Sequence, residues 1–258
     1  MSNIHGSLGE LHALDALAAG RTTVHRLHPL AKLCSALIFI LAVVSFGRYD
    51  FLPLTPYLFY PFILMALAEI PYGILLKRVL VALPFCLFAG LSNVFFDRET
   101  AFTLGSVTIS YGVLSLLTIL LKMYLSVMAA LLLVATTPFV ELTAQLRRLR
   151  VPMQFVTVFE MTYRYAGVLL LETRSMGMAY ALRSGGKRAL EMRHMGSFVG
   201  GLLLRGFDRA ERIHAAMRCR GYSLRTVPRA PRPLRGADVW ALAAIVTASA
   251  VLRFVRLF

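Results

Sequence analysis

Charged residues are scarce in this chain, and acidic residues are the scarcest of them. Only 16% of the 258 residues are charged, with 13 Asp and Glu against 28 Lys and Arg, whereas soluble proteins average about 25%. Hydrophobic residues make up 58% of the chain. This balance excludes an ordinary soluble domain and predicts an integral membrane protein.

Paired cysteines and the common catalytic motifs are also missing. The three cysteines, Cys34, Cys86 and Cys219, are isolated and form no C-x-x-C pair, which excludes a disulfide framework and the usual zinc sites. The sequence holds no Walker A motif, no H-E-x-x-H and no G-x-S-x-G, the signatures of nucleotide, metalloprotease and serine-hydrolase chemistry. We therefore expect no catalytic residue, no metal site, no bound cofactor and no enzyme activity in this chain.

Long apolar runs are what the chain has instead. A bilayer-spanning helix needs about 20 apolar residues, and five runs come close to that length. They are Leu30–Phe46, Phe51–Ala68, Val79–Phe96, Tyr111–Thr136 and Ala237–Phe258. The pattern predicts an all-α membrane protein with about five transmembrane helices. Lys77 and Arg78 are expected in the second loop, and a small hairpin between Asp97 and Ser110.

Positive charge is concentrated in one stretch of the chain. The net charge is +15, and residues 138–236 hold 18 of the 28 Lys and Arg but 6 of the 13 Asp and Glu, a local balance of +12. Interleaving with apolar helical runs argues against nucleic-acid binding. The positive-inside rule places this stretch and the N-terminus in the cytoplasm, and Leu8–Ala19 is expected to form a short amphipathic helix there.

The basic stretch is predicted to be an insert of about three helices. Prolines 138 and 152 favour helix starts, while Gly185-Gly186 and Gly221 favour helix ends. Val151–Arg183 is expected to be one helix of about 45 Å, lying in or below the membrane interface because Glu160 and Arg164 interrupt it. A second long helix, loosened by its glycines, is expected from Glu191 to Arg220.

The predicted organisation therefore has four parts. They are a membrane domain over residues 1–137, a cytoplasmic insert over 138–222, a Pro- and Arg-rich linker over 223–236 and a last transmembrane helix over 237–258.

A short pattern occurs twice in the insert. Ala179 lies four residues before Arg183, which Ser184 follows, and Ala216 lies four residues before Arg220, which Gly221 follows. Residues i and i+4 share a helix face, so each copy predicts a flat small-residue patch beside one guanidinium at a helix end. Two equivalent patches indicate docking onto two equivalent partners, although Ala and Arg are also common helix formers.

Three further polar features lie in or near the apolar runs. His25 and His28 have chelating spacing, but without a Cys or carboxylate to complete the set a structural role is favoured over metal binding. Lys122 lies within a predicted span, where we expect it to reach the headgroups or to pair with a partner subunit. Asn93 is a candidate for a hydrogen bond between helices.

The chain resembles the transmembrane T component of energy-coupling factor (ECF) transporters, and in particular its cobalt-type CbiQ members. The resemblance rests on Asp15, on His25-Arg-Leu-His-Pro-Leu-Ala-Lys32 and on Ala216-Met-Arg-Cys-Arg-Gly-Tyr222. Family members carry two Ala-Arg-Gly signatures at the ends of coupling helices that dock into ATPase subunits. Leu182-Arg183-Ser184 and Cys219-Arg220-Gly221 match these signatures, and each departs from strict Ala-Arg-Gly.

The resemblance implies a function and a set of partners. It implies a coupling subunit in the cytoplasmic (inner) membrane that links two ABC-type ATPases to a CbiM-like substrate-binding membrane protein, with cobalt as the transported ion. A membrane-embedded transferase acting on lipid-linked phosphates is the alternative, and it calls for clustered carboxylates or histidines. A secondary transporter calls for repeated halves or ionisable relays at membrane depth. The sequence favours neither.

Overall fold

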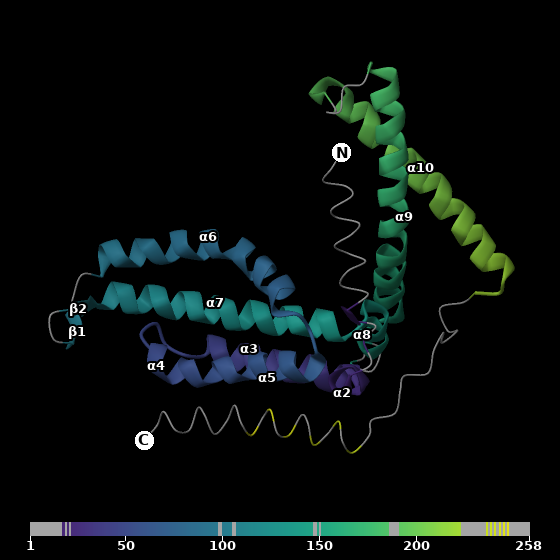
Figure 1. Ribbon diagram of the computed structural model, residues 1–258. Coiled ribbons are helices and arrows are strands. Elements are labelled where there is room, and N and C mark those ends of the chain that lie inside the picture. Colours follow the sequence, from purple (N-terminus) through teal and green to yellow (C-terminus); the bar gives the residue numbers. More distant parts are fainter. Residues whose placement is uncertain are drawn as a thin grey trace. The chain divides into compact units, whose positions relative to one another are not determined.

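The computed structural model is dominated by helices (Figure 1). It describes residues 22–97, 100–104, 107–146, 151–185 and 191–222, together with Leu17, Ala18, Gly20, Leu149, Gly236, Asp238, Trp240, Ala243, Ile245 and Thr247. The expected helix over Leu8–Ala19, the linker over 223–236 and the last span over Ala237–Phe258 lie largely outside the described residues, as does Asp15.

The described helices and strands follow one another in the order α2 (Thr23–Arg26), α3 (Pro29–Val44), α4 (Phe51–Leu54), η1 (Thr55–Leu58), α5 (Phe59–Ala68), α6 (Tyr72–Phe96), β1 (Thr100–Leu104), β2 (Val107–Ser110), α7 (Tyr111–Thr136), α8 (Phe139–Leu146), α9 (Met153–Arg183) and α10 (Met192–Cys219). They form two compact units, which divide between Pro138 and Phe139. The all-α membrane fold is confirmed, and the expected hairpin is the antiparallel pair β1–β2.

Three described helical segments are long and apolar enough to cross a membrane. They are Phe51–Ala68, Tyr72–Phe95 and Tyr111–Thr136. The expected first span corresponds to α3, a shorter apolar helix of 16 residues. α3 begins where the sequence caps it, because His28 Nδ1 accepts the Leu30 N–H at 3.2 Å and Pro29 occupies the first helical position.

The core of the membrane unit lies around α7, which contacts α3, α4, α5 and α6. Leu125 and Ala129 of α7 pack with Phe39 of α3 and with Leu54 and Tyr57. One turn further along α7, Met128, Leu132 and Ala135 form a second buried cluster with residues of α2, α5 and α6. Because α7 supplies both clusters, it is the central helix of this unit.

The expected start of the third span at Val79 is wrong. α6 begins at Tyr72, so Lys77 and Arg78 lie inside a helix instead of in a loop. The chain turns earlier, where Glu69 has a left-handed φ of 54°. Leu75 and Val79 are buried in the core cluster that contains residues of α7. A helix places these two residues on one face, so Lys77, on another face, is exposed.

Lys122 also differs from its expected role. Its Nζ donates to the backbone oxygen of Phe46 at 2.6 Å and to that of Val44 at 3.5 Å. The last carbonyls of an α-helix have no partner within the helix, and Lys122 binds that of Val44, the last residue of α3, and that of Phe46 just beyond it. The charge is therefore used inside this chain, and neither headgroups nor a partner subunit are needed to explain it.

Close backbone packing joins α6 to α7 beside the hairpin. Asn93 Nδ2 donates to Ser115 Oγ at 2.9 Å, which confirms the expected interhelical hydrogen bond. Gly112 N–H donates to the Asp97 oxygen at 3.1 Å. A Cβ on Gly112 would lie 2.7 Å from the Val94 Cα and 2.8 Å from the Asn93 oxygen. Only glycine allows the two backbones to approach this closely.

We expect Gly112→Ala to destabilise the membrane unit by about 1–3 kcal/mol, since backbone atoms on both sides must shift to admit the methyl group. Gly73→Ala is the matched control, because nothing lies within 4 Å of a Cβ there and alanine favours a helix. Thermal unfolding of the two purified variants in detergent measures the difference. A Gly112→Ala midpoint equal to that of the wild type would contradict the close packing.

The second unit contains the three helices predicted for the insert. α8 follows Pro138, and Pro152 caps α9, a helix of 31 residues. Phe139 of α8 stacks on Tyr163 of α9 with ring centroids 4.3 Å apart, and Thr143 Oγ1 donates to Glu160 Oε1 at 3.3 Å. α10 runs unbroken through its glycines, where a loosened helix was expected.

Candidate functional site

The first Ala-Arg copy lies at the end of α9. The last helical residue is Arg183, and the Ser184 N–H donates to the Tyr180 oxygen at 2.9 Å. Gly185 then adopts a φ of +67°, the left-handed conformation that commonly ends a helix. Glycine therefore ends this helix as predicted, and Ser184 is the cap that precedes it.

The second copy lies at the end of α10 and is built more tightly. The Gly221 N–H donates to the Arg218 oxygen and the Tyr222 N–H donates to the Met217 oxygen, both at 3.0 Å. With Gly221 at a φ of +70°, these two bonds form a Schellman motif. Arg220 is the cap residue of this helix, whereas Arg183 is the last helical residue of α9. The two copies are thus offset by one position relative to their helix ends.

Both copies present their residues outward. Of the eight predicted site residues, Ser184 is half-buried and the other seven are exposed, namely Ala179, Leu182, Arg183, Ala216, Cys219, Arg220 and Gly221. Leu182 stands out, because 85% of its surface is exposed. Within the part of the chain that the structure describes, neither the Arg183 nor the Arg220 side chain forms an ion pair or hydrogen bond. Both guanidinium groups are free to bind a partner.

Each of these helix ends is also joined to the start of the other long helix. Tyr180 of α9 hydrogen-bonds through its hydroxyl to His194 Nδ1 of α10 at 3.1 Å. The Tyr222 hydroxyl, just past α10, lies 3.4 Å from Thr157 Oγ1 in the second turn of α9. Between these two ties α10 crosses α9 (Figure 1), where Glu172 pairs with Arg205. These three contacts therefore fix both arginine-bearing helix ends to the neighbouring long helix.

A groove of about 590 Å³ lies between α9 and the part of α10 from Val199 to Met217. Apolar side chains line most of it, among them Met161 and Leu169 of α9 and Leu203, Phe207 and Met217 of α10. Met192, Met195 and Val199 continue an exposed apolar face toward the start of α10. The groove forms between two crossing helices, so no local pattern in the sequence marks it.

The histidines of the segment before α3 have structural partners. Thr22 Oγ1 lies 2.6 Å from His25 Nδ1, and His25 Nε2 lies 3.0 Å from the Leu17 oxygen. His28 caps α3. Among the described residues no group of three or more His, Cys, Asp or Glu side chains is placed to hold a metal ion.

Comparison with known proteins identifies the family. The profile of the CbiQ family, described as cobalt transport protein, matches residues 20–229. The chain belongs to the CbiQ family. The match contains both arginine-bearing helix ends and the helices α8, α9 and α10 of the unit that carries them. With its apolar helices, the chain is thus a multi-pass membrane protein of a transport family.

Two relatives show how far the similarity extends. The chain is 32% identical over 126 residues to the cobalt transport protein CbiQ of Rhodobacter capsulatus, covering 46% of this chain and 52% of that protein. It is 29% identical over 175 residues to an uncharacterised protein of Methanocaldococcus jannaschii, covering 62% of this chain and 59% of that protein. The chain spans between half and three fifths of the length of these curated relatives.

The two contacts of Tyr180 and Tyr222 could not be predicted from the sequence of this CbiQ-family chain. The ties of Tyr180 and Tyr222 join residues that are 14 and 65 positions apart, and no local pattern marks such pairs. The Ala-Arg copies, by contrast, were found because they are local, with i and i+4 on one helix face and glycine just beyond.

Proposed function

We propose that this chain is the membrane coupling subunit of an ATP-driven ECF-type uptake transporter for cobalt ions. Two cytoplasmic ABC-type ATPases dock on the Arg183 and Arg220 ends, and a separate CbiM-like membrane subunit binds the ion. ATP hydrolysis takes place in the ATPases. The chain lies in the inner membrane with its N-terminus and its insert inside. Membership of a cobalt transport family supports the transported ion.

One observation supports the docking role above the others. The paired arginines end two crossed helices of one unit, and both lie exposed without side-chain partners among the described residues. For its own stability the protein gains only the small dipole interaction of an exposed cation at a helix C-terminus, about 0.3–1 kcal/mol for each arginine. A carboxylate, or a backbone carbonyl at the end of a helix, on a partner would bind each guanidinium through charge-assisted hydrogen bonds. Movement of the ATPases would then pass to α9 and α10, which are already joined by the contacts of Tyr180, Tyr222 and Glu172.

The native Cys219 tests both the topology and the docking. It is exposed and adjoins Arg220, and in a Cys34→Ala, Cys86→Ala background it is the sole thiol. We expect a membrane-impermeant maleimide to label it in inside-out vesicles and not in intact cells, because the +12 stretch should stay in the cytoplasm. Addition of the ATPases should then slow the labelling.

A second single-cysteine chain provides the control for steric protection. Ser175 is exposed on α9, two turns before Arg183, and Ser175→Cys in the background Cys34→Ala, Cys86→Ala, Cys219→Ala should label equally with and without the ATPases. Labelling of Cys219 from outside sealed cells would contradict the topology. An unchanged labelling rate in the presence of bound ATPases would contradict docking at Arg220.

A further inference from the structure

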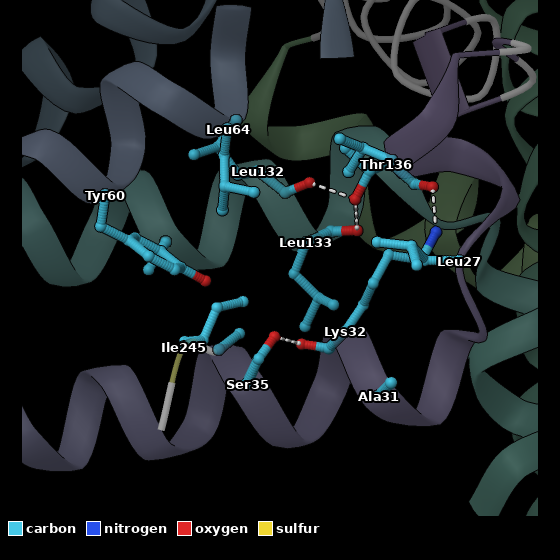
Figure 2. A pocket seen from close by; sticks show the side chains of 13 residues that line it. Leu27, Ala31, Lys32, Ser35, Tyr60, Leu64, Leu132, Leu133, Thr136 and Ile245 are labelled. Atoms are coloured by element: carbon cyan, nitrogen blue, oxygen red, sulfur yellow. Dashed lines mark hydrogen bonds between the residues drawn. The ribbon is translucent and has the colours of Figure 1, made fainter. Parts of the chain in front are cut away.

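The first turn of α3 contains a buried lysine whose charge the docking site does not use. Lys32 is only 8% exposed. Its Nζ donates to the Thr136 oxygen at 2.8 Å and to the His25 oxygen at 3.4 Å. Figure 2 shows the side chain extending from α3 to the carbonyl of Thr136, beside a small cavity lined by Leu27, Leu132 and Leu133.

Thr136 is the last residue of α7, so Lys32 binds one of the carbonyls that the helix itself leaves unpaired. A cation at a helix C-terminus also complements the helix dipole. Along the chain, Pro138 follows two residues later, and α8, the first helix of the insert, begins at Phe139. Lys32 therefore binds the chain just before it leaves the membrane unit, which it does after Pro138.

The residue that caps α3 also binds a residue from the C-terminal part of the membrane unit. The His28 N–H, at the cap of α3, donates to Asp238 Oδ1 at 2.8 Å. Asp238 is only 5% exposed and lies beyond the insert, 210 residues after His28. Thr136, which precedes the insert in the sequence, and Asp238, which follows the linker after it, are thus both bound by residues 28–32.

Lys122 provides an internal comparison for this arrangement. It lies 14 residues before Thr136, just as Lys32 lies 14 residues before Phe46, and it donates to the Phe46 oxygen at 2.6 Å. Lys32, in the first turn of α3, binds the last residue of α7, and Lys122, near the middle of α7, binds the carbonyls at the end of α3. The two helices therefore run in opposite directions, with one such bond at each end of α3. The two bonds have the same chemistry, but only that of Lys32 lies at the junction with the insert.

We propose that residues His28–Lys32 form a clamp on Thr136 and Asp238, the residues of the membrane unit that flank the insert and its linker in the sequence, and that Lys32 and Asp238 are the positioning residues through which movement of the insert reaches the membrane helices. The part concerning transport rests on the proposed function. Without the clamp, the carbonyl of Thr136 would lose its Lys32 partner, and movement of the insert would displace the membrane helices less. The clamp also gives a role to the His25–Lys32 segment, which docking alone leaves unexplained.

Hydrogen–deuterium exchange of the full-length chain in detergent tests the clamp itself. We expect Lys32→Met, which keeps the side-chain volume and removes the charge, to speed exchange of the amides in residues 136–146 about tenfold, equivalent to about 1.4 kcal/mol of local stability. Lys122→Met should leave that segment unchanged. Asp238→Ala, which breaks the other half of the clamp, should raise exchange there too and replaces Lys32→Met if that variant does not fold. Unchanged exchange in Lys32→Met or in Asp238→Ala would overturn the clamp.

The assembled transporter in proteoliposomes tests the consequence. Cobalt uptake per ATP hydrolysed should be lost in Lys32→Met, retained in Lys122→Met and restored by Lys32→Arg, while each variant binds the ATPases as the wild type does. If Lys32→Met raised amide exchange in residues 136–146 but kept the wild-type cobalt uptake per ATP, Lys32 would be purely structural and the inference would be overturned. Failure of the wild-type chain to bind any ATPase would instead refute the proposed function, and the exchange result would stand apart from it.

Discussion

A chain carrying both Arg183→Ala and Arg220→Ala is expected to retain no ATPase subunit during purification and to support no transport. Each guanidinium is exposed and unpaired within the described residues, so its removal should cost the isolated chain only its interaction with the helix dipole, about 0.3–1 kcal/mol. In the complex, each charge-assisted hydrogen bond is worth about 1.5–3 kcal/mol, which corresponds to about a 10- to 150-fold loss of affinity for each site.

Single substitutions should have smaller effects than the double one. When one arginine is left, the ATPase bound there keeps the other ATPase at a high effective concentration near its weakened site. We therefore expect weakened assembly and reduced transport, but no complete loss. Arg→Lys should also weaken docking if the planar fork of the guanidinium is used.

Arg218→Ala is the matched control for charge. Arg218 is exposed, lies two residues before Arg220 and faces nearly the opposite side of α10. It should bind the ATPases like the wild type. The measurement is the amount of ATPase that copurifies with each variant, together with cobalt uptake. Full ATPase retention by the double variant would exclude docking through these arginines.

Local signals in the sequence located most of this fold. Pro138, Pro152, Gly185 and Gly221 delimit the insert helices correctly, because each acts on the backbone of its own turn. The start of α6 was misplaced because hydropathy treats Lys77 and Arg78 as a loop. A helix tolerates them when Leu75 and Val79 alone need burial.

The roles of individual polar residues required the three-dimensional structure. Lys122 was singled out as a charge within a predicted span, but its partners, the carbonyls of Val44 and Phe46, lie about 80 residues earlier in the chain. Backbone acceptors leave no trace in a residue pattern. The same holds for Lys32 and Thr136. The repeat was found, but its offset was not, since Ser184 matches Gly221 in sequence although Gly185 is its conformational equivalent.

A bulky side chain at Ala216 should uncouple transport without unfolding the chain. Ala216 is exposed and lies one turn before Arg220 on the same side of α10, so a partner that binds Arg220 must pack closely over it. Ala216→Trp would overfill that contact, and overpacking of a close-fitting surface costs about 1–3 kcal/mol or more. We expect ATPase binding and cobalt uptake to fall sharply, whereas Ala216→Ser should behave like the wild type.

The neighbouring alanine makes this test specific. Ala215 is equally exposed but points about 100° away around the helix, so Ala215→Trp adds the same bulk to the same turn outside the expected contact. It should retain ATPase binding and uptake, and the thermal unfolding midpoints of both Trp variants should match that of the wild type, because neither side chain enters the core. Equal transport by the two Trp variants would mean that the Ala216 side of α10 faces solvent in the complex. The Ala-Arg repeat would then owe its spacing to helix composition alone.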